Sequence, residues 1–122
     1  MKGNGMCGGT SDENAKVHGA VYVTDDGSGY YGFSFQWNND ASAMAEANAQ
    51  CRKTSGGRPC RKLINAVNQC AAVVFARQGD RILGIAGSAE ATQEEADRKA
   101  VRECEINNPG ADCKIEKRFC SY

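Results

Sequence analysis

Hydrophobic and polar positions alternate in short runs on either side of two turns. Residues 20–24 and 30–36 flank a turn rich in Gly and Asp, and residues 73–76 and 82–86 flank a second turn. β-Forming runs separated by such turns are typical of β-hairpins. The pattern therefore predicts one hairpin in each half of the chain.

A helical pattern of small residues follows each hairpin, and a short β-forming run follows each helical pattern. Asn39 stands at the N-cap position of the first helix, and Thr92 with Glu95 forms a capping box for the second. One face of each helix is made of small residues: Ala43, Ala47 and Cys51, and then Ala96, Ala100 and Cys104. Small residues let a helix lie close to a sheet. The last strands are expected at residues 61–67 and 114–119.

The two halves of the chain repeat one another. A shift of 52 residues places Ala20 and Gly32 on Ala72 and Gly84, and a shift of 53 aligns the helical Ala-x3-Ala-x3-Cys patterns and the Cys-x8-Cys spacings. We therefore predict a β-β-α-β unit used twice, at residues 18–69 and 70–122, around a pseudo-two-fold axis. The expected fold class is α+β, an antiparallel sheet with two helices packed on it, stabilised by disulfides.

Residues 1–17 are rich in Gly and polar side chains and are predicted to be a flexible tether. Cys7, followed by Gly-Gly-Thr-Ser, is similar to the start of a mature bacterial lipoprotein, so Cys7 is a candidate for lipidation. The alternative is an incidental or intermolecular thiol. No signal peptide is visible. The longest apolar run, residues 70–76, is far shorter than the ~20 residues of a membrane helix.

Seven cysteines are the unusual feature of the composition. No Cys-x2-Cys pair is present and His18 is the only histidine, which disfavours a zinc site or a thiol redox site. A disulfide framework is expected instead, and it implies an oxidising compartment. The repeat narrows the pairing: Cys51–Cys60 and Cys104–Cys113 would each tie a helix to the next strand, leaving Cys70–Cys120 to join across the pseudo-two-fold axis. We expect neither a metal nor a cofactor.

One unusual strand bears a row of aromatic residues. Tyr31, Phe33, Phe35 and Trp37 alternate onto one face, whereas the matching positions of the second copy are Leu83, Ile85, Gly87 and Ala89. Phe35 and Trp37 therefore either fill a volume that the second copy does not have or act as exposed binding anchors.

A basic loop is the second local feature. Five cations occur within eleven residues without an acid: Arg52, Lys53, Arg58, Arg61 and Lys62. The matching loop of the second copy is mainly acidic. This loop is either ordinary solvated surface or a docking site for an acidic partner. Nucleic acid is not an expected partner, because fifteen basic residues are balanced by fifteen acidic ones.

No catalytic residue is predicted. A histidine that acts as a general base in a hydrolase needs a nucleophile, and the sequence has no Gly-x-Ser-x-Gly motif to provide one. His18 is therefore assigned a structural role. Asp25 and Asp26 belong to a turn that lacks the later carboxylate of a calcium loop.

The order of these motifs is similar to that of a known family. The motifs are His18-Gly19-Ala20, the aromatic strand at 31–35, the Ala-rich helix ending at Cys51, then Cys60, Cys70-Ala71-Ala72, Cys104, Cys113 and Cys120. Over about residues 18–122 the chain resembles the bacterial domain-of-unknown-function 4189 family. The resemblance implies export, as secreted proteins or envelope lipoproteins, and some members act as immunity proteins against antibacterial toxins. It implies no catalytic residues.

We therefore predict an exported, periplasmic or secreted, non-catalytic protein-binding domain, most plausibly an immunity protein that neutralises an antibacterial toxin in the periplasm. One alternative is a secreted effector or cell-envelope hydrolase with an acidic site, and another is a structural envelope module. A cleft that contains His18 with an acid in hydrogen-bonding distance would favour the enzyme. A flat patch at Phe35 and Trp37, or at the basic loop, would favour the binding protein.

Overall fold

Two β-β-α-β units follow one another along the chain. The computed structural model describes residues 16–122, so the predicted tether up to residue 15 and Cys7 lie outside the described residues. The elements are β2 (His18–Thr24), β3 (Tyr31–Trp37), α1 (Asp40–Thr54), β4 (Cys60–Val67), β5 (Cys70–Gln78), β6 (Arg81–Glu90), α2 (Gln93–Asn107) and β7 (Asp112–Cys120). The order confirms the duplicated unit that the sequence predicts.

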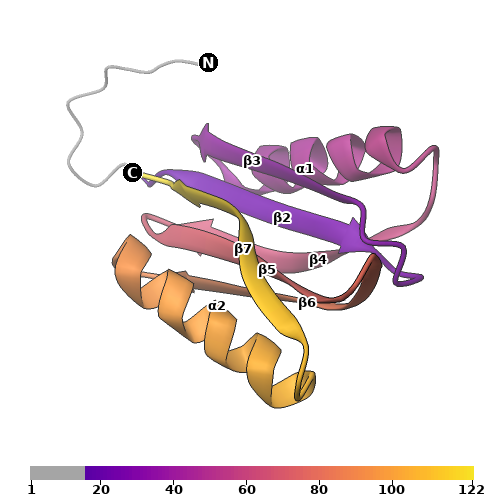
Figure 1. Ribbon diagram of the computed structural model, residues 1–122. Coiled ribbons are helices and arrows are strands. Elements are labelled where there is room, and N and C mark those ends of the chain that lie inside the picture. The colour runs from indigo at the N-terminus through magenta and orange to yellow at the C-terminus, as the bar shows by residue number, and fades with distance from the viewer. Residues whose placement is uncertain (1–15) are drawn as a thin grey trace.

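The six strands form two antiparallel sheets, with the orders β3-β2-β4 and β6-β5-β7. The α+β class is confirmed, but each repeat builds its own sheet where a shared sheet was expected. The two sheets pack face to face, and α1 and α2 cover their opposite outer faces (Figure 1). The molecule is therefore a four-layer sandwich in which each repeat supplies one helix and one sheet.

The side chains of β5 show why the layers form. Val73 and Phe75 join the core between the sheets, whereas Val74 and the alanines on its side pack against α2. Every residue from Cys70 to Phe75 is buried. A central strand covered on both faces requires such a continuous apolar run. In β2, Val21 and Val23 face the same central core.

Both helices begin at the predicted caps and bury the predicted small faces. The side chain of Asn39 accepts a hydrogen bond from the Ser42 N–H, and that of Thr92 accepts one from the Glu95 N–H. The approach of α1 to its sheet is so close that a Cβ atom at Gly32 would collide with the backbone of Ala47. Neither helix is long and apolar enough to span a membrane.

Three disulfides join the predicted cysteine pairs, Cys51–Cys60, Cys104–Cys113 and Cys70–Cys120. The location of the third differs from the expectation. Cys70 and Cys120 are register partners on β5 and β7, neighbouring strands of the second sheet, so this bridge lies within one repeat and does not cross the pseudo-two-fold axis. The reason is that Cys70 is the first residue of a central strand whose antiparallel neighbour ends at Cys120.

One irregularity is also repeated. A register shift on β4 leaves Leu63 as an extra residue opposite Val21 and Tyr22, and a shift on β7 leaves Glu116 as an extra residue opposite Val73 and Val74. The two extra residues occupy equivalent places in the repeats. The bulge of β7 positions the Glu116 carboxylate for the contacts described below.

Candidate binding site along strand β3

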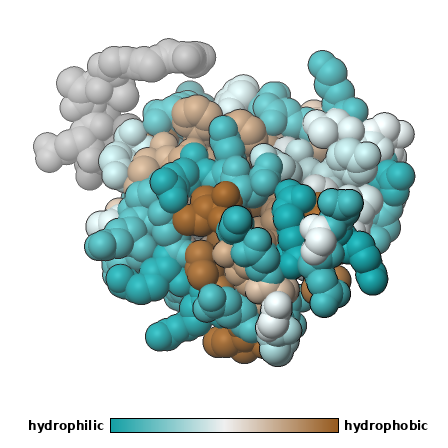
Figure 2. Space-filling view, in the orientation of Figure 1, coloured by the Kyte–Doolittle hydropathy of each residue, from teal (hydrophilic) through white to brown (hydrophobic). Residues whose placement is uncertain are grey.

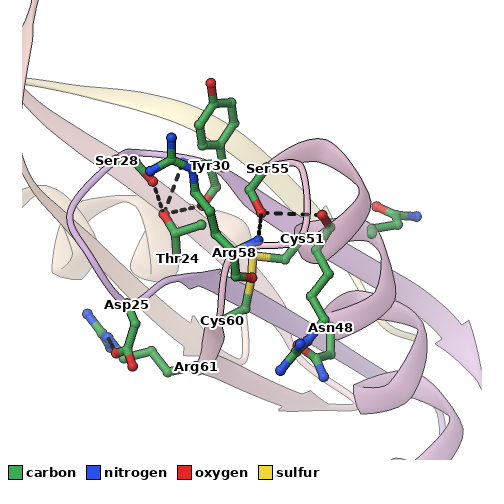
Figure 3. Close-up of a disulfide and its surroundings, with 12 residues drawn as sticks. Thr24, Asp25, Ser28, Tyr30, Asn48, Cys51, Ser55, Arg58, Cys60 and Arg61 are labelled. Carbon is green, nitrogen blue, oxygen red and sulfur yellow. Dashed lines mark hydrogen bonds and ion pairs between the residues drawn. A yellow bond between two sulfur atoms is a disulfide. The ribbon is translucent and has the colours of Figure 1, made fainter.

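The basic loop lies where α1 ends and β4 begins, beside the β2–β3 turn. The Asp25 N–H donates a hydrogen bond to the Pro59 carbonyl, which fixes the loop against the turn. Arg58 Nη1 lies 2.9 Å from Asp26 Oδ2, and Arg61 Nε lies 3.8 Å from Asp25 Oδ1. Figure 3 shows Asp25, Arg58 and Arg61 around the Cys51–Cys60 disulfide.

Arg58 and Arg61, two of the five cations of the basic loop, are thus paired with carboxylates of the turn. The sequence did not reveal this long-range pairing. The salt bridges of residues 16–122 leave Arg52, Lys53 and Lys62 without a carboxylate partner. The loop therefore keeps an excess of positive charge, which suits an acidic partner.

Asp26 is held ionised by its neighbours. Hydrogen bonds from the side chain and backbone of Ser28, followed by the Arg58 guanidinium, lower the pKa of Asp26 to about 2. The Ser28 N–H lies 3.0 Å from Asp26 Oδ1. The Arg58–Asp26 pair is consequently charged at neutral pH, and it orients the Arg58 side chain.

Tyr30 is an exposed aromatic residue next to this pair, and the sequence analysis did not select it as a binding residue. The Arg58 guanidinium carbon lies 5.7 Å from the centre of the Tyr30 ring, and 40% of Tyr30 is exposed. A shallow hollow of about 290 Å³ lies alongside, lined by Gly29, Tyr30, Tyr31, Phe33, Gln50 and Thr54. An aromatic hollow with a basic rim is a suitable receptor for an anchoring side chain of a protein partner.

The aromatic row on β3 faces the second repeat. The Phe35 ring stacks on Phe119 of β7 with centroids 5.6 Å apart, and Phe33 stacks on the same ring at 6.2 Å. Phe35 nevertheless remains 43% exposed. Its counterpart Gly87 has no room for a side chain, because a Cβ atom there would lie 2.6 Å from Ile64. Phe35 thus combines features of the two alternatives, since it packs on the other repeat and still presents surface.

Trp37 lies at the far end of β3, where the regular strand is interrupted. Gln36 has a φ of 67°, so the predicted alternation does not continue regularly to Trp37. The Gln36 amide donates hydrogen bonds to the carbonyls of Cys120 and Tyr122, at 3.2 and 3.3 Å. Trp37 itself is 36% exposed and pairs with His18 on β2.

The predicted binding residues therefore form two groups rather than one. Phe35 and Trp37 lie near the start of α1, and the basic loop lies at its end. α1 has 15 residues and, at about 1.5 Å per residue, is about 22 Å long. The strand β3 runs between the two groups, with the aromatic hollow beside its first half.

His18 has an acid within hydrogen-bonding distance. Its Nδ1 lies 3.2 Å from Asp40 Oδ1, and Asn65 Nδ2 donates to Asp40 Oδ2 at 3.1 Å. His18 lines neither this hollow nor the other prominent one, which lies on α2. Within residues 16–122 no group of three His, Cys, Asp or Glu side chains is placed to hold a metal ion.

The side of the molecule that carries α2 and β7 has no large continuous apolar patch among the described residues. Figure 2 shows the side with α2 and β7 toward the viewer, where hydrophobic residues occur in small patches between hydrophilic ones. Obligate interfaces bury larger continuous apolar areas.

The fold and the site together define a disulfide-stabilised α+β domain of two β-β-α-β repeats with an aromatic and basic surface on the first. The family model described as domain of unknown function (DUF4189) matches residues 18–120, so the chain belongs to this family, in agreement with the sequence resemblance. No curated protein and no solved structure matches the chain.

Proposed function

We propose that this chain is an exported, disulfide-stabilised domain that binds another protein and catalyses no reaction. The observation behind the proposal is the asymmetry between the repeats. The first repeat presents exposed aromatic side chains along β3 and a basic rim, whereas the equivalents of Tyr30, Phe35 and Trp37 are Ile82, Gly87 and Ala89. Scaffold features are shared by the two repeats, so the features that differ are the better candidates for function.

The composition of this surface fits a protein interface. Tyr, Trp and Arg are the residues that most often dominate binding energy. A standard interface covers roughly 800 Å² per partner, a patch roughly 30 Å across. One partner could therefore contact both the basic loop and the Phe35–Trp37 group, which are separated by the length of α1. The unpaired cations favour a partner with an acidic surface.

Three disulfides support export, because such bonds persist in oxidising compartments. We place the protein in the periplasm or outside the cell, and we propose an antibacterial toxin as its partner, so that the domain acts as an immunity protein. This finer role follows the family resemblance of the sequence, and the structure is compatible with it.

A hydrolase is the second candidate, and the His18–Asp40 contact favours it. A carboxylate at Nδ1 can orient a histidine as a general base through Nε2. However, the equivalents of His18 and Asp40 in the second repeat are Cys70 and Gln93, and Cys70 is bonded to Cys120. His18 thus occupies the place of a cysteine that belongs to a structural crosslink, and we assign His18 a structural role as well.

The proposal is tested by site-specific photo-crosslinking in the cells that produce the protein. A benzoylphenylalanine residue replaces Thr54, which lines the hollow, or Asn107, which occupies the equivalent place on α2. We expect one discrete protein to be crosslinked from residue 54 and not from residue 107. Equal crosslinking from both positions, or none from either, would contradict a binding site on the first repeat.

A further inference from the structure

The strand β3 has an open edge. Within residues 16–122 it is the outer strand of its sheet and pairs only with β2. The Phe33 N–H donates to the side-chain oxygen Oε1 of Gln50 on α1, at 3.2 Å, and is therefore directed away from β2. Because backbone direction alternates along a strand, the N–H and C=O groups of Tyr31 share this outward direction. Such an edge is a template for another strand.

On the open edge of β3, the Gln50 side chain substitutes for a neighbouring strand at Phe33 alone. Its amide oxygen satisfies the Phe33 N–H as a strand carbonyl would, and its Nε2 lies 3.4 Å from Glu46 Oε2. No side chain within residues 16–122 accepts a hydrogen bond from the Tyr31 N–H. The partly buried Gln50 side chain belongs to the helix surface and can move aside, and a backbone carbonyl that replaces it keeps the hydrogen bond of the Phe33 N–H.

The surroundings of this edge indicate what would bind there. The aromatic hollow lies directly beside Tyr31 and Phe33, so a side chain of an added strand has a place to pack. Lys117 Nζ lies 4.2 Å from the centre of the Phe33 ring. Arg52 and Lys53 lie in the last turn of α1, next to Thr54 of the hollow, and the salt bridges of residues 16–122 leave them without a carboxylate partner. Arg58, stacked on Tyr30, is already paired with Asp26. An extended segment with acidic side chains complements this charge.

We propose that the protein partner adds an extended acidic segment as a fourth strand to the open edge of β3, displacing the Gln50 amide and placing one side chain in the hollow. This inference rests on the proposed protein-binding function and specifies how the partner is recognised. Main-chain hydrogen bonds would provide affinity, and the hollow and the flanking cations would provide specificity.

The second repeat explains why one edge is selected. β6 is also an outer strand, but the residue equivalent to Gln50 is Glu103, an exposed carboxylate on α2. Glu105 lies on the same helix, close to its end. Glu103 and Glu105 replace the neutral Gln50 and the cation Arg52, so an acidic strand would meet like charge at these two positions. The contrast is local to them, because Glu46, beside Gln50, is replaced by Lys99 on α2. The Glu103→Ala variant therefore provides a matched control for Gln50→Ala.

The test uses a random decapeptide library displayed on phage and selected against the oxidised protein. The selected peptides are synthesised with single N-methyl groups at successive backbone positions. We expect Asp- or Glu-containing peptides whose affinity falls at least tenfold on N-methylation at alternate positions and changes less than twofold at the positions between. Gln50→Ala is expected to tighten peptide binding a few-fold, and Glu103→Ala is expected to leave it unchanged.

Two results would overturn strand addition: selection of no peptide, or an N-methyl scan without alternation. Because the scan modifies the peptide, its result does not depend on whether a protein variant folds. If either result occurs while crosslinking from residue 54 is specific, strand addition fails and the protein-binding function stands. If crosslinking also fails, both proposals are wrong.

Discussion

The Tyr31 hydroxyl of the first repeat donates a hydrogen bond to Glu116 of the second, with 3.3 Å between the oxygens. Glu116 is the extra residue of the β7 bulge, and Arg77 Nη2 lies 3.6 Å from its other carboxylate oxygen. The aromatic strand is thereby fixed to the opposite sheet at the end where the hollow lies. The same residue, Tyr31, packs edge-on against Phe75 in the central core, with centroids 5.7 Å apart.

Tyr31→Phe removes this hydrogen bond and leaves the ring in place. We expect the free energy of unfolding to fall by about 0.5–1 kcal/mol, because the contact is partly exposed. Urea denaturation of the oxidised protein measures the change. Glu116→Gln also removes the Arg77 ion pair, so the double variant should lose more than Tyr31→Phe alone but less than the sum of the two single changes, and full additivity would contradict a shared interaction.

The same contact makes stability sensitive to alkaline pH. Burial, followed by the charge of Glu116 and the hydrogen bond to it, raises the pKa of Tyr31 above 10.0. A folded-state pKa above the unfolded value stabilises the protein below pH 10 and is lost as the pH rises through the folded value. Unfolding curves recorded between pH 9 and 11 should show this loss in the wild type, and the loss attributable to this group should disappear in Tyr31→Phe.

Asp26 should affect stability at acidic pH. Its pKa is about 2 in the folded protein against a usual 3.8, so its contribution is present above pH 3.8 and is lost as the pH falls toward 2. Carbon-13 NMR titration of the side-chain carboxyl measures this pKa directly. Ser28→Ala should raise the pKa more than Arg58→Ala, because the Ser28 hydrogen bonds are its largest causes. A pKa near 3.8 in the wild type would show that Asp26 has neither the Ser28 hydrogen bonds nor the Arg58 ion pair.

The disulfides should appear in mass spectra of alkylated, unreduced protein. We expect six protected thiols, with linked peptides for 51–60, 104–113 and 70–120. Replacing the pair Cys51 and Cys60 by alanine should reduce the free energy of unfolding by roughly 2.5–3 kcal/mol, and the matched pair in the second repeat should cost the same. Four or more free thiols would contradict both the pairing and the proposal of export.

Charge reversal in the basic loop should act mainly on the rate of association. Arg52→Glu with Arg58→Glu is expected to slow association with the crosslinked partner and to weaken its salt dependence, because rim charges steer encounter. Arg98→Glu with Arg102→Glu makes the same charge change on α2 and serves as the control. Surface plasmon resonance at several salt concentrations measures both rates. If both double variants slow association equally, the net charge of the protein, and not the position of the basic loop, determines the association rate.

The repeat order, the helix caps and the cysteine pairs were predictable because spacing along the chain encodes them. Asn39 and Thr92 cap through residues three positions away, and each local disulfide spans nine residues. Periodicity indicates which side chains share a face of a strand, but it does not indicate which strand edges meet. The division into two sheets, and the location of Cys70–Cys120 within one of them, therefore had to come from the structure.

The aromatic hollow depends on contacts that sequence patterns do not encode. Arg58 reaches Asp26 and Tyr30 across about thirty residues, and Gln50 reaches Phe33 from a different element. The sequence did offer one signal for the contact between Arg58 and Asp26. The same repeat contains a turn with two acidic residues and a loop with five cations. The alternating pattern also predicted a regular strand through Gln36, which is wrong. Gln36 has a positive φ, and an alternation of apolar and polar residues does not reveal a single left-handed residue within a strand.

The affinity of the crosslinked and purified partner for four single variants is the most direct test of the central claim. Tyr30→Ala and Trp37→Ala remove exposed aromatic residues of the first repeat, while Leu83→Ala and Ile106→Ala truncate exposed apolar side chains of the second. After circular dichroism has shown that each variant folds, isothermal titration calorimetry gives the four dissociation constants. We expect a loss of about thirtyfold, about 2 kcal/mol, for each first-repeat variant and less than threefold for each control. Wild-type affinity in both Tyr30→Ala and Trp37→Ala would show that the first repeat is not the interface.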